Sequence, residues 1–249
     1  MKPKTLVLRA AGTNCDGETA FAFELAGSTV EKVHLNAILE KPAILDDYQI
    51  LAFPGGFSYG DDIAAGKVLA KQITARLGDT LRRFIESGKP VIGVCNGFQV
   101  LVKTDLLPGP LAGQTGQTAT LAHNDSGRFV CRWTKVRAAG DKCIWTRGIG
   151  EIELPIAHGE GKLVPASEQA RQELHQNGQI ALEYVGENPN GSTDAIAGVC
   201  DSTGLVFGLM PHPERHVSPL QHPAWASRGQ TEGDGQGLAI FRNAVKHVG

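Results

Sequence analysis

The 249-residue sequence lacks the long apolar runs and the charge excess that mark several protein classes. No stretch approaches the roughly 20 apolar residues that cross a bilayer, and the first residues hold an apolar run too short for the core of a secretory signal. The formal net charge is -2, so there is no basic field for nucleic acid or an anionic membrane. We therefore expect a cytoplasmic chain that binds neither nucleic acid nor membrane.

Cysteine pairs and phosphate-binding loops are also missing. The sequence has five cysteines, none of them in a Cys-x-x-Cys pair, so neither a disulfide framework nor a zinc ribbon is indicated. That usage fits a reduced compartment in which one thiol is chemically active. The glycine-rich segment Phe53 to Asp61 has no Gly-Lys-Ser/Thr after it, which argues against a Walker-type ATP site. We expect no metal and no cofactor bound by this chain.

What the sequence does have is the pattern of one α/β domain spanning residues 1–249, with no internal repeat and no linker. In the first half, apolar strands alternate with amphipathic helices, which predicts a doubly wound, mostly parallel central sheet flanked by helices. The expected strands are Thr5–Ala10, Tyr48–Phe53, Pro90–Val94, Ala119–Ala122, Phe129–Arg137, Ile152–Ile156, Ile180–Val185, Ala195–Cys200 and Leu205–Leu209, and the expected helices are Glu18–Ala26, Ala64–Ser87, one that begins near Phe98, Ser167–Gln176 and Leu238–Val248.

The segment Gly93-Val94-Cys95-Asn96-Gly97 has the form of a nucleophile elbow with cysteine as the nucleophile. It follows a predicted strand and precedes a predicted helix, so Cys95 would lie on a tight turn at a helix N-terminus. The helix dipole and the free N–H groups there favour a thiolate. The motif also arises by chance, and taken alone it leaves a buried structural cysteine as the more common alternative.

A thiol nucleophile needs a base and a group that orients the base. Among the eight histidines, His212 follows the predicted strand Leu205–Leu209, at the sheet edge where α/β sites form. Prolines on both sides keep the backbone extended, so His212 and Glu214 project from the same face. A carboxylate there can hold the imidazole tautomer. Taken alone, the segment also suits a solvated proline-rich turn.

A third candidate loop, Pro54-Gly55-Gly56, follows the strand that ends at Phe53. Glycine lets the backbone approach a substrate closely, so the N–H of Gly56, together with that of Asn96, can form an oxyanion hole. A plain turn between a strand and a helix is the alternative.

Together, Pro54 to Gly56, Gly93 to Gln99 and His212 to Glu214 resemble, in order and spacing, the class I (triad) glutamine amidotransferases. That family has a flavodoxin-like, doubly wound fold and releases ammonia from glutamine through a cysteine thioester. Further blocks resemble the branch that serves purine synthesis, so the resemblance covers most of the chain. These blocks are Gly12 to Asp16, Phe57 to Asp62, Pro155 to Gly161, Asn188 to Ser192 and Met210 to Arg215.

The resemblance implies a role for each residue of the site. Cys95 is the nucleophile, His212 is the general acid and base, and Glu214 orients His212. The backbone N–H groups of Gly56 and Asn96 form the oxyanion hole. Gln99 and Gly55 bind glutamine.

The resemblance also implies partners. L-glutamine is the substrate, and the ammonia passes to a large synthetase subunit that converts formylglycinamide ribonucleotide (FGAR) to formylglycinamidine ribonucleotide (FGAM) with ATP. ATP and magnesium are expected on that large partner, and a small bridging subunit is also expected. An amidotransferase of another pathway and a non-catalytic module on the same fold are the alternatives. The intact set of Cys95, His212 and Glu214 argues against the second.

Four further residues have weaker signals. Asn124 and Phe129 follow a strand and can hold the backbone of glutamine, although an ordinary turn at Asn124 is the more common structure. His158 suits the ammonia path, the partner interface or a purely structural role. Cys15 has no base near it in the sequence, so we predict a structural role for it.

Two segments look longer and more polar than is usual for the family, Gly109–Ala119 and Ser218–Gly237. We predict a flexible surface loop at 218–237, with partial disorder. Neither segment holds a triad residue, so we expect both to affect docking of the partner rather than hydrolysis.

Overall fold

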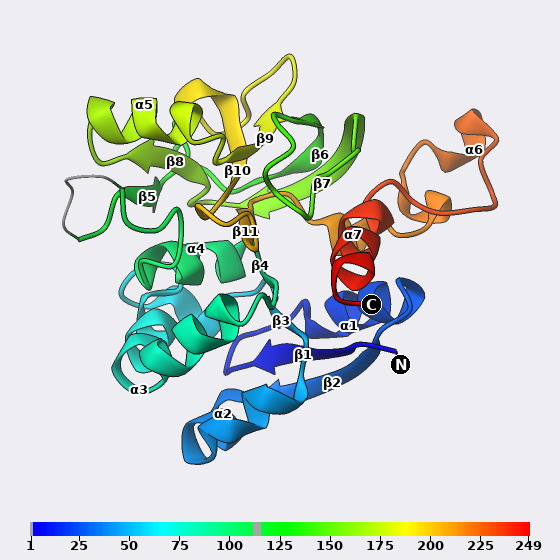
Figure 1. The fold of residues 1–249 in the computed structure, drawn as a ribbon. Coiled ribbons are helices and arrows are strands. Elements are labelled where there is room, and N and C mark those ends of the chain that lie inside the picture. The colour runs from blue at the N-terminus through cyan, green and yellow to red at the C-terminus, as the bar shows by residue number, and fades with distance from the viewer. Residues whose placement is uncertain (1, 112–115) are drawn as a thin grey trace.

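The computed structural model describes residues 2–111 and 116–249, so part of the polar segment Gly109–Ala119 lies outside the described residues. One nine-stranded sheet runs through the molecule in the order β2-β1-β3-β4-β11-β10-β9-β6-β7, and β5 pairs with β8 in a second sheet (Figure 1). The strands are β1 (Lys4–Arg9), β2 (Thr29–His34), β3 (Ile50–Phe53), β4 (Val91–Val94), β5 (Ala119–Ala122), β6 (Val130–Ala138), β7 (Glu151–His158), β8 (Lys162–Pro165), β9 (Ile180–Tyr184), β10 (Ile196–Cys200) and β11 (Val206–Leu209).

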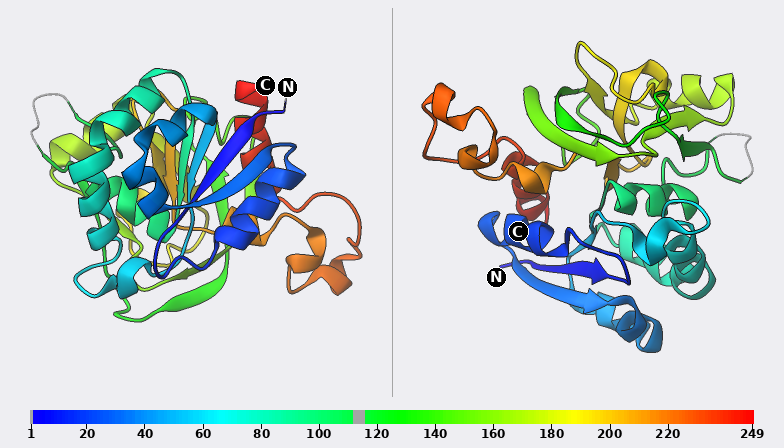
Figure 2. Two further views of the ribbon diagram at one scale, coloured as in Figure 1. Left: turned by 90° about the horizontal axis from the view of Figure 1, so that it is seen from below. Right: turned by 180° about the vertical axis from the view of Figure 1, so that it is seen from behind.

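The first five strands of that order, β2 to β11, are parallel. Strands β3, β4 and β11 are continuous apolar runs because helices cover both faces of the sheet. Helices α1 and α7 pack together on one face, and α2, α3 and α4 lie on the other (Figures 1 and 2). The helices are α1 (Asp16–Leu25), α2 (Leu35–Glu40), α3 (Lys67–Glu86), α4 (Asn96–Lys103), α5 (Glu168–Gln176), α6 (Trp225–Arg228) and α7 (Leu238–Val248).

Four strands, β10, β9, β6 and β7, extend the sheet in antiparallel pairs. Strand β7 alternates buried and partly exposed residues, as a strand with one face toward solvent does. This antiparallel arm, β10, β9, β6 and β7, also contacts the parallel half of the sheet. The N–H of His212, after β11, donates to the carbonyl of Pro155 in β7 (2.8 Å). The predicted α/β fold around a parallel central sheet is confirmed, with the antiparallel arm added to it.

An aromatic cluster holds the last helix on the sheet. Phe23 of α1 lies edge-on to Phe241 of α7 (ring centroids 4.9 Å apart) and to Trp145 (6.4 Å). Trp145 is fully buried, and its indole N–H donates to the carbonyl of Leu205, just before β11 (2.9 Å). The two chain ends lie side by side (Figures 1 and 2).

The segment Ser218–Gly237 projects from the body of the molecule (Figures 1 and 2). The sequence predicted a plain loop, but the segment contains a 3-10 turn that begins with a capping box at Ser218, and then α6. Arg228 at the end of α6 forms an ion pair with Glu153 of β7 (2.6 Å). The predicted flexibility of the segment stays a prediction.

Every predicted strand and helix is present, with ends shifted by at most three residues. Among the α-helices and strands, four were missed: α2, α6, β8 and β2. Strand β2 lies at the sheet edge and has no buried run, so its sequence gives no hydrophobic signal. Within residues 2–111 and 116–249, every helix is too short or too polar to cross a lipid bilayer.

Candidate active site

Cys95 lies on the turn between β4 and α4, as predicted. Its φ of 50° and ψ of −104° are a strained conformation for a residue with a side chain. Glycines permit the turn: a Cβ on Gly97 would lie 1.9 Å from the carbonyl oxygen of Phe53, and a Cβ on Gly93 would lie 2.6 Å from the oxygen of Gly97. Cys95 is thus the N-cap residue of α4, and its thiol donates to the carbonyl of Ala157 (3.7 Å).

Backbone hydrogen bonds bring the histidine segment to this elbow. The N–H of Cys95 donates to the carbonyl of Leu209, at the end of β11 (2.8 Å). His212 follows shortly after Leu209, and Pro155 of β7 fixes its backbone from the other side. The parallel pairing of β4 with β11 thus places side by side two segments that are far apart in the sequence.

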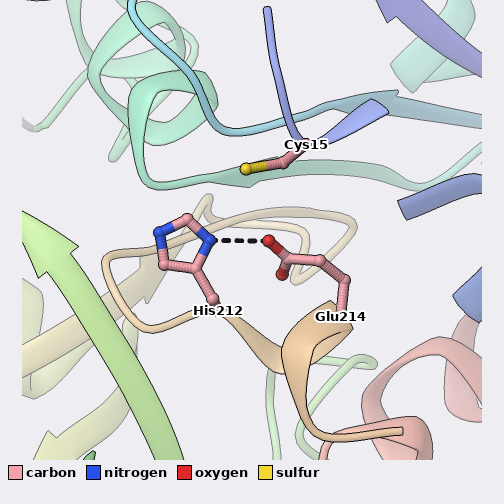
Figure 3. A group of neighbouring side chains, drawn as sticks. All are labelled: Cys15, His212 and Glu214. Atoms are coloured by element: carbon pink, nitrogen blue, oxygen red, sulfur yellow. Dashed lines mark hydrogen bonds and ion pairs between the residues drawn. The ribbon is translucent and has the colours of Figure 1, made fainter. Parts of the chain in front are cut away.

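His212 and Glu214 form a buried pair. The imidazole Nδ1 lies 2.6 Å from Oε1 of Glu214, and the side chains are 2% and 0% exposed (Figure 3). Because the carboxylate accepts from Nδ1, the other ring nitrogen, Nε2, is left for the reaction. Among the described residues, Nε2 of His212 has no hydrogen-bond partner although it is buried.

The surroundings of His212 favour its protonated form. Burial opposes the charge, but the Glu214 carboxylate, followed by Cys95 and Cys15, outweighs burial and raises the pKa of His212 well above its usual value of 6.5. A protonated imidazole beside a thiol stabilises the thiolate. The pair of Cys95 and His212 can therefore supply both a nucleophile and a proton for a leaving group.

A cavity of about 250 Å³ opens beside Cys95, and Gly56 forms part of its wall. Gln99 also lines it: its Nε2 donates to the carbonyl of Glu160 (2.6 Å), and its Oε1 accepts from Nδ2 of Asn96 (3.0 Å). The side-chain Oδ1 of Asn96 accepts from the N–H of Ser58 (3.1 Å). Asn96 thus ties the elbow to the loop that carries Gly56.

His158 lines the same cavity in a fixed tautomer. The amide nitrogen of Asn124 donates to the carbonyls of His158 (2.8 Å) and Arg128 (3.0 Å), so its Oδ1 faces Nδ1 of His158 (3.1 Å). Nδ1 must therefore donate, and the buried Nε2 is an acceptor without a partner in the part of the chain that the structure describes. Burial, and then the charge of His212, lower the pKa of His158 to about 4. The ring is neutral at neutral pH.

Comparison with known proteins places this site in a family. The family model described as a CobB/CobQ-like glutamine amidotransferase domain matches residues 2–248. A phosphoribosylformylglycinamidine synthase subunit PurQ from Dehalococcoides mccartyi is 51% identical over 252 residues, 98% of this chain and 97% of the relative. The subunit of the same name from Treponema denticola is 46% identical and covers 87% of this chain and 89% of its own. The chain belongs to the PurQ family.

Solved structures agree with this assignment. A chain of the structure titled "Structure of PurLQS from Thermotoga maritima" matches with a TM-score of 0.78 and 33% identity, over 100% of both chains. A glutamine amidotransferase from Thermotoga maritima matches with a TM-score of 0.54 over 92% of this chain and 82% of its own. Its identity of 15% shows the shared fold alone. The resemblance to class I glutamine amidotransferases is confirmed, and PurQ is its branch.

In this PurQ-family chain, most of the predicted site residues lie together at the carboxyl ends of β3, β4 and β11. Asn124 does not line the cavity. Its side chain is hydrogen-bonded to Arg128, His158 and Gly161, so it acts on the cavity by holding His158. Phe129 is 54% exposed at the cavity mouth, beside Phe57 (ring centroids 6.4 Å apart). Of the predicted site residues, the cavity is lined by Cys95, Gly56, Gln99, His158 and Phe129. His212, Glu214 and Asn96 are not in its lining, and Gly55 lies against His212.

Cys15 is the residue whose surroundings the sequence missed. We predicted a structural cysteine with no base nearby, but ligand atoms of Cys15, His212 and Glu214 lie within 4.8 Å of one another (Figure 3). Nη2 of Arg215 donates to the Cys15 sulfur (3.0 Å). Thiol, imidazole and carboxylate are zinc ligands in other proteins, but a guanidinium beside the sulfur disfavours a cation. No local pattern signals this contact, because the two loops meet only across the folded sheet.

Proposed function

We propose that this PurQ-family chain hydrolyses L-glutamine to glutamate and ammonia through a thioester on Cys95. The ammonia goes to the synthetase subunit that converts FGAR to FGAM with ATP in purine biosynthesis. The observation that carries the proposal is the buried pair of His212 and Glu214, 2.6 Å apart, at the elbow that presents Cys95 to a cavity. A nucleophile, an oriented base and an oxyanion loop around one cavity are the parts that acyl transfer requires.

The reaction has two halves. The Cys95 thiolate attacks the side-chain amide carbon of glutamine, and the carbonyl π electrons move onto oxygen. As this intermediate collapses, the C–N bond breaks and protonated His212 gives its proton to the departing nitrogen, which leaves ammonia and a glutamyl thioester. His212, now neutral, takes a proton from water, and the resulting hydroxide attacks the thioester. Glutamate leaves and the Cys95 thiolate returns beside a protonated His212.

The N–H groups of Gly56 and Asn96 stabilise the oxyanion of this intermediate. Asn96 is the first residue of α4, where the N–H groups have no acceptor within the helix. Gly56 has a φ of 151°, which favours glycine, and a Cβ there would lie 2.6 Å from the oxygen of Gly12. One such donor lowers the barrier by roughly 3 kcal/mol in comparable enzymes.

The cavity suits an amino acid with a free ammonium group. Its volume of about 250 Å³ is that of a small-metabolite site, and Asp61 and Glu160 provide negative charge in its wall. Gln99 lies on the first turn of α4 and is placed to contact the substrate, while Phe129 covers the mouth. His158, held by Asn124, completes the set of residues that we assign to glutamine binding.

The ammonia has a partner as its destination. The relatives are named as subunits of phosphoribosylformylglycinamidine synthase, and the matched structure is titled PurLQS. We infer an assembly of the same kind, in which the large synthetase subunit holds ATP and magnesium and a small subunit bridges. Exposed Phe57 and Phe129, which line the cavity, offer an apolar docking surface. A cytoplasmic location belongs to the proposal, since all five cysteines are free thiols.

Replacing the nucleophile tests the proposal. Cys95→Ser should abolish glutamine-dependent FGAM synthesis by the reconstituted complex and leave synthesis from free ammonia intact, because only the ammonia source is lost. Cys131→Ser, which changes an exposed thiol, serves as the matched control and should retain both activities. Glutamine hydrolysis at the parental rate in Cys95→Ser would refute the assignment.

A further inference from the structure

The loop Gly12–Cys15, which follows β1, holds the oxyanion peptide in place. The N–H groups of Asn14 and Cys15 both donate to the carbonyl of Gly55 (3.3 and 3.1 Å). In a trans peptide the N–H points opposite to the carbonyl, so the N–H of Gly56 is turned away from this loop. Within the described residues that N–H meets no acceptor, and Gly56 lines the cavity beside Cys95. The loop therefore sets the direction of the donor.

The same loop reaches the catalytic histidine through its last side chain. Cys15 is 1% exposed, and its sulfur accepts from Nη2 of Arg215 (3.0 Å) and donates to Oδ1 of Asn14 (3.1 Å). A Cβ on Gly55 would lie 2.9 Å from Cε1 of His212 and 3.1 Å from this sulfur. The absence of a side chain at Gly55 thus lets the sulfur and the imidazole approach each other, and Figure 3 shows the sulfur directed toward the ring.

Charged and titratable groups face His212 from four elements. Glu214 and Arg215 follow β11, Cys95 is at the start of α4, His158 ends β7 and Cys15 precedes α1. The Glu214 carboxylate is the strongest of the groups that raise the pKa of His212 against burial, and Cys95 and Cys15 act in the same direction. Burial opposes the charge of Arg215, but Cys15 and then Glu214 outweigh it and raise the pKa of Arg215. The sulfur of Cys15 is thus a polar bridge between the two cationic groups.

From this geometry we propose that Cys15, held by Arg215, is a positioning residue that fixes His212 relative to the oxyanion peptide. The inference rests on the proposed glutaminase function. One loop then sets both the donor that receives the developing negative charge and the imidazole that protonates the departing nitrogen. The mutual placement of these two groups decides the rate of the chemical step, and it affects glutamine binding little because Cys15 does not line the cavity.

The test compares Cys15→Ala and Cys15→Ser in the assembled synthase. In Cys15→Ala, kcat for glutamine hydrolysis should fall by about tenfold or more, with KM little changed, because misplacing a catalytic group costs up to about 10²-fold. The basic limb of kcat/KM should move to lower pH, since a group that favours protonated His212 is gone. Cys15→Ser retains a polar atom beside Arg215 and should recover part of kcat. A purely structural cysteine would not move the pH limb.

Three further variants make the outcome decisive. Cys131→Ala, the loss of an exposed thiol, should leave kcat and the pH profile at parental values. If Cys15→Ala does not fold, the same measurements are made on Cys15→Ser and Arg215→Lys. A parental kcat and an unshifted basic limb of kcat/KM in both variants would overturn the inference. Cys95→Ala separates the two claims. If it retains hydrolysis, the proposed function fails, whereas if it is inactive and Cys15→Ala behaves as the parent, only the role of Cys15 fails.

Discussion

A buried imidazole nitrogen with no partner is uncommon in proteins, and in the part of the chain that the structure describes, His158 presents one in the wall of the cavity. Asn124 fixes the tautomer, so Nε2 can only accept while the ring is neutral. The low pKa of about 4 keeps it neutral across the pH range of metabolism. We predict that this acceptor pairs with an N–H of the glutamine carboxamide.

Replacing His158 should therefore discriminate between two substrates. His158→Ala should lower kcat/KM for glutamine about five- to tenfold, the value of one hydrogen bond of about 1 kcal/mol. Hydrolysis of the γ-methyl ester of glutamate should be unchanged, since the ester has no N–H to donate. Steady-state kinetics on both substrates measures the ratio, with His123→Ala as a control at the same cavity, where the side chain is 82% exposed. An equal loss on both substrates would mean that His158 only maintains the structure.

Neutralising Glu214 should change both the rate and its pH dependence. Glu214→Gln keeps the shape of the side chain but removes the charge that does most to raise the pKa of His212. The pKa of His212 falls, so the basic limb of kcat/KM should move to lower pH. The rate should drop less than in Cys95→Ser, because the nucleophile remains. A series of kcat/KM measurements across the neutral and basic pH range tests this, and an unmoved limb would contradict it.

At the scale of single residues, the placement of Cys95, His212 and Glu214 could be predicted from the sequence, and the contact of Cys15 with Arg215 could not. Cys95, His212 and Glu214 belong to short local patterns, a turn between flanking glycines and an extended segment between prolines, whose geometry depends on near neighbours. The contact between Cys15 and Arg215 joins residues 200 positions apart. Its existence depends on β1 and β11 carrying their loops to the same sheet edge, which no local pattern encodes.

At the scale of elements, the block Asn188 to Ser192 braces the loop that follows His158 at the end of β7. Nδ2 of Asn190 and the hydroxyl of Ser192 both donate to the carbonyl of Gly161 (2.8 and 3.3 Å). The sequence indicated this block through resemblance alone, without a role. The structure gives the block a role, which is to hold the loop between β7 and β8. Strand β8 was not predicted from the sequence.

Two neighbouring glycines of that loop provide a matched test. A Cβ on Gly161 would lie 2.3 Å from Cε1 of His158, whereas a Cβ on Gly159 would meet only the ring of Phe129, at 3.9 Å. Gly161→Ala should therefore displace His158 and lower kcat/KM for glutamine at least as much as His158→Ala. Gly159→Ala should stay near the parental value. Both are measured in the glutaminase assay, and equal effects of the two substitutions would count against the role of His158.

At the scale of the whole molecule, the last helix supports the active site as well as the core. Helix α7 packs on α1 through Phe241 and Phe23. Its start is close to the pair of His212 and Glu214, because a Cβ on Gly237 would lie 2.1 Å from the carbonyl of Pro213. Phe241→Ala should lower the free energy of unfolding by about 3–5 kcal/mol, the cost of a large cavity. Urea denaturation measures it, with Phe21→Ala, a phenylalanine of α1 that is 51% exposed, as the control. A loss below about 1 kcal/mol would show that the site collapses around the cavity.

The side-by-side chain ends have a consequence for engineering. A short linker can join them, and the backbone can be reopened within Ser218–Gly237, which projects from the body on the side away from β3 and β4 (Figures 1 and 2). Such a circular permutant would keep every strand of the parallel sheet beside its present neighbours, while α7 moves from the end of the chain to a place ahead of β1. Ammonia production should survive the rearrangement, since the order of elements along the polymer matters less than their register in the sheet.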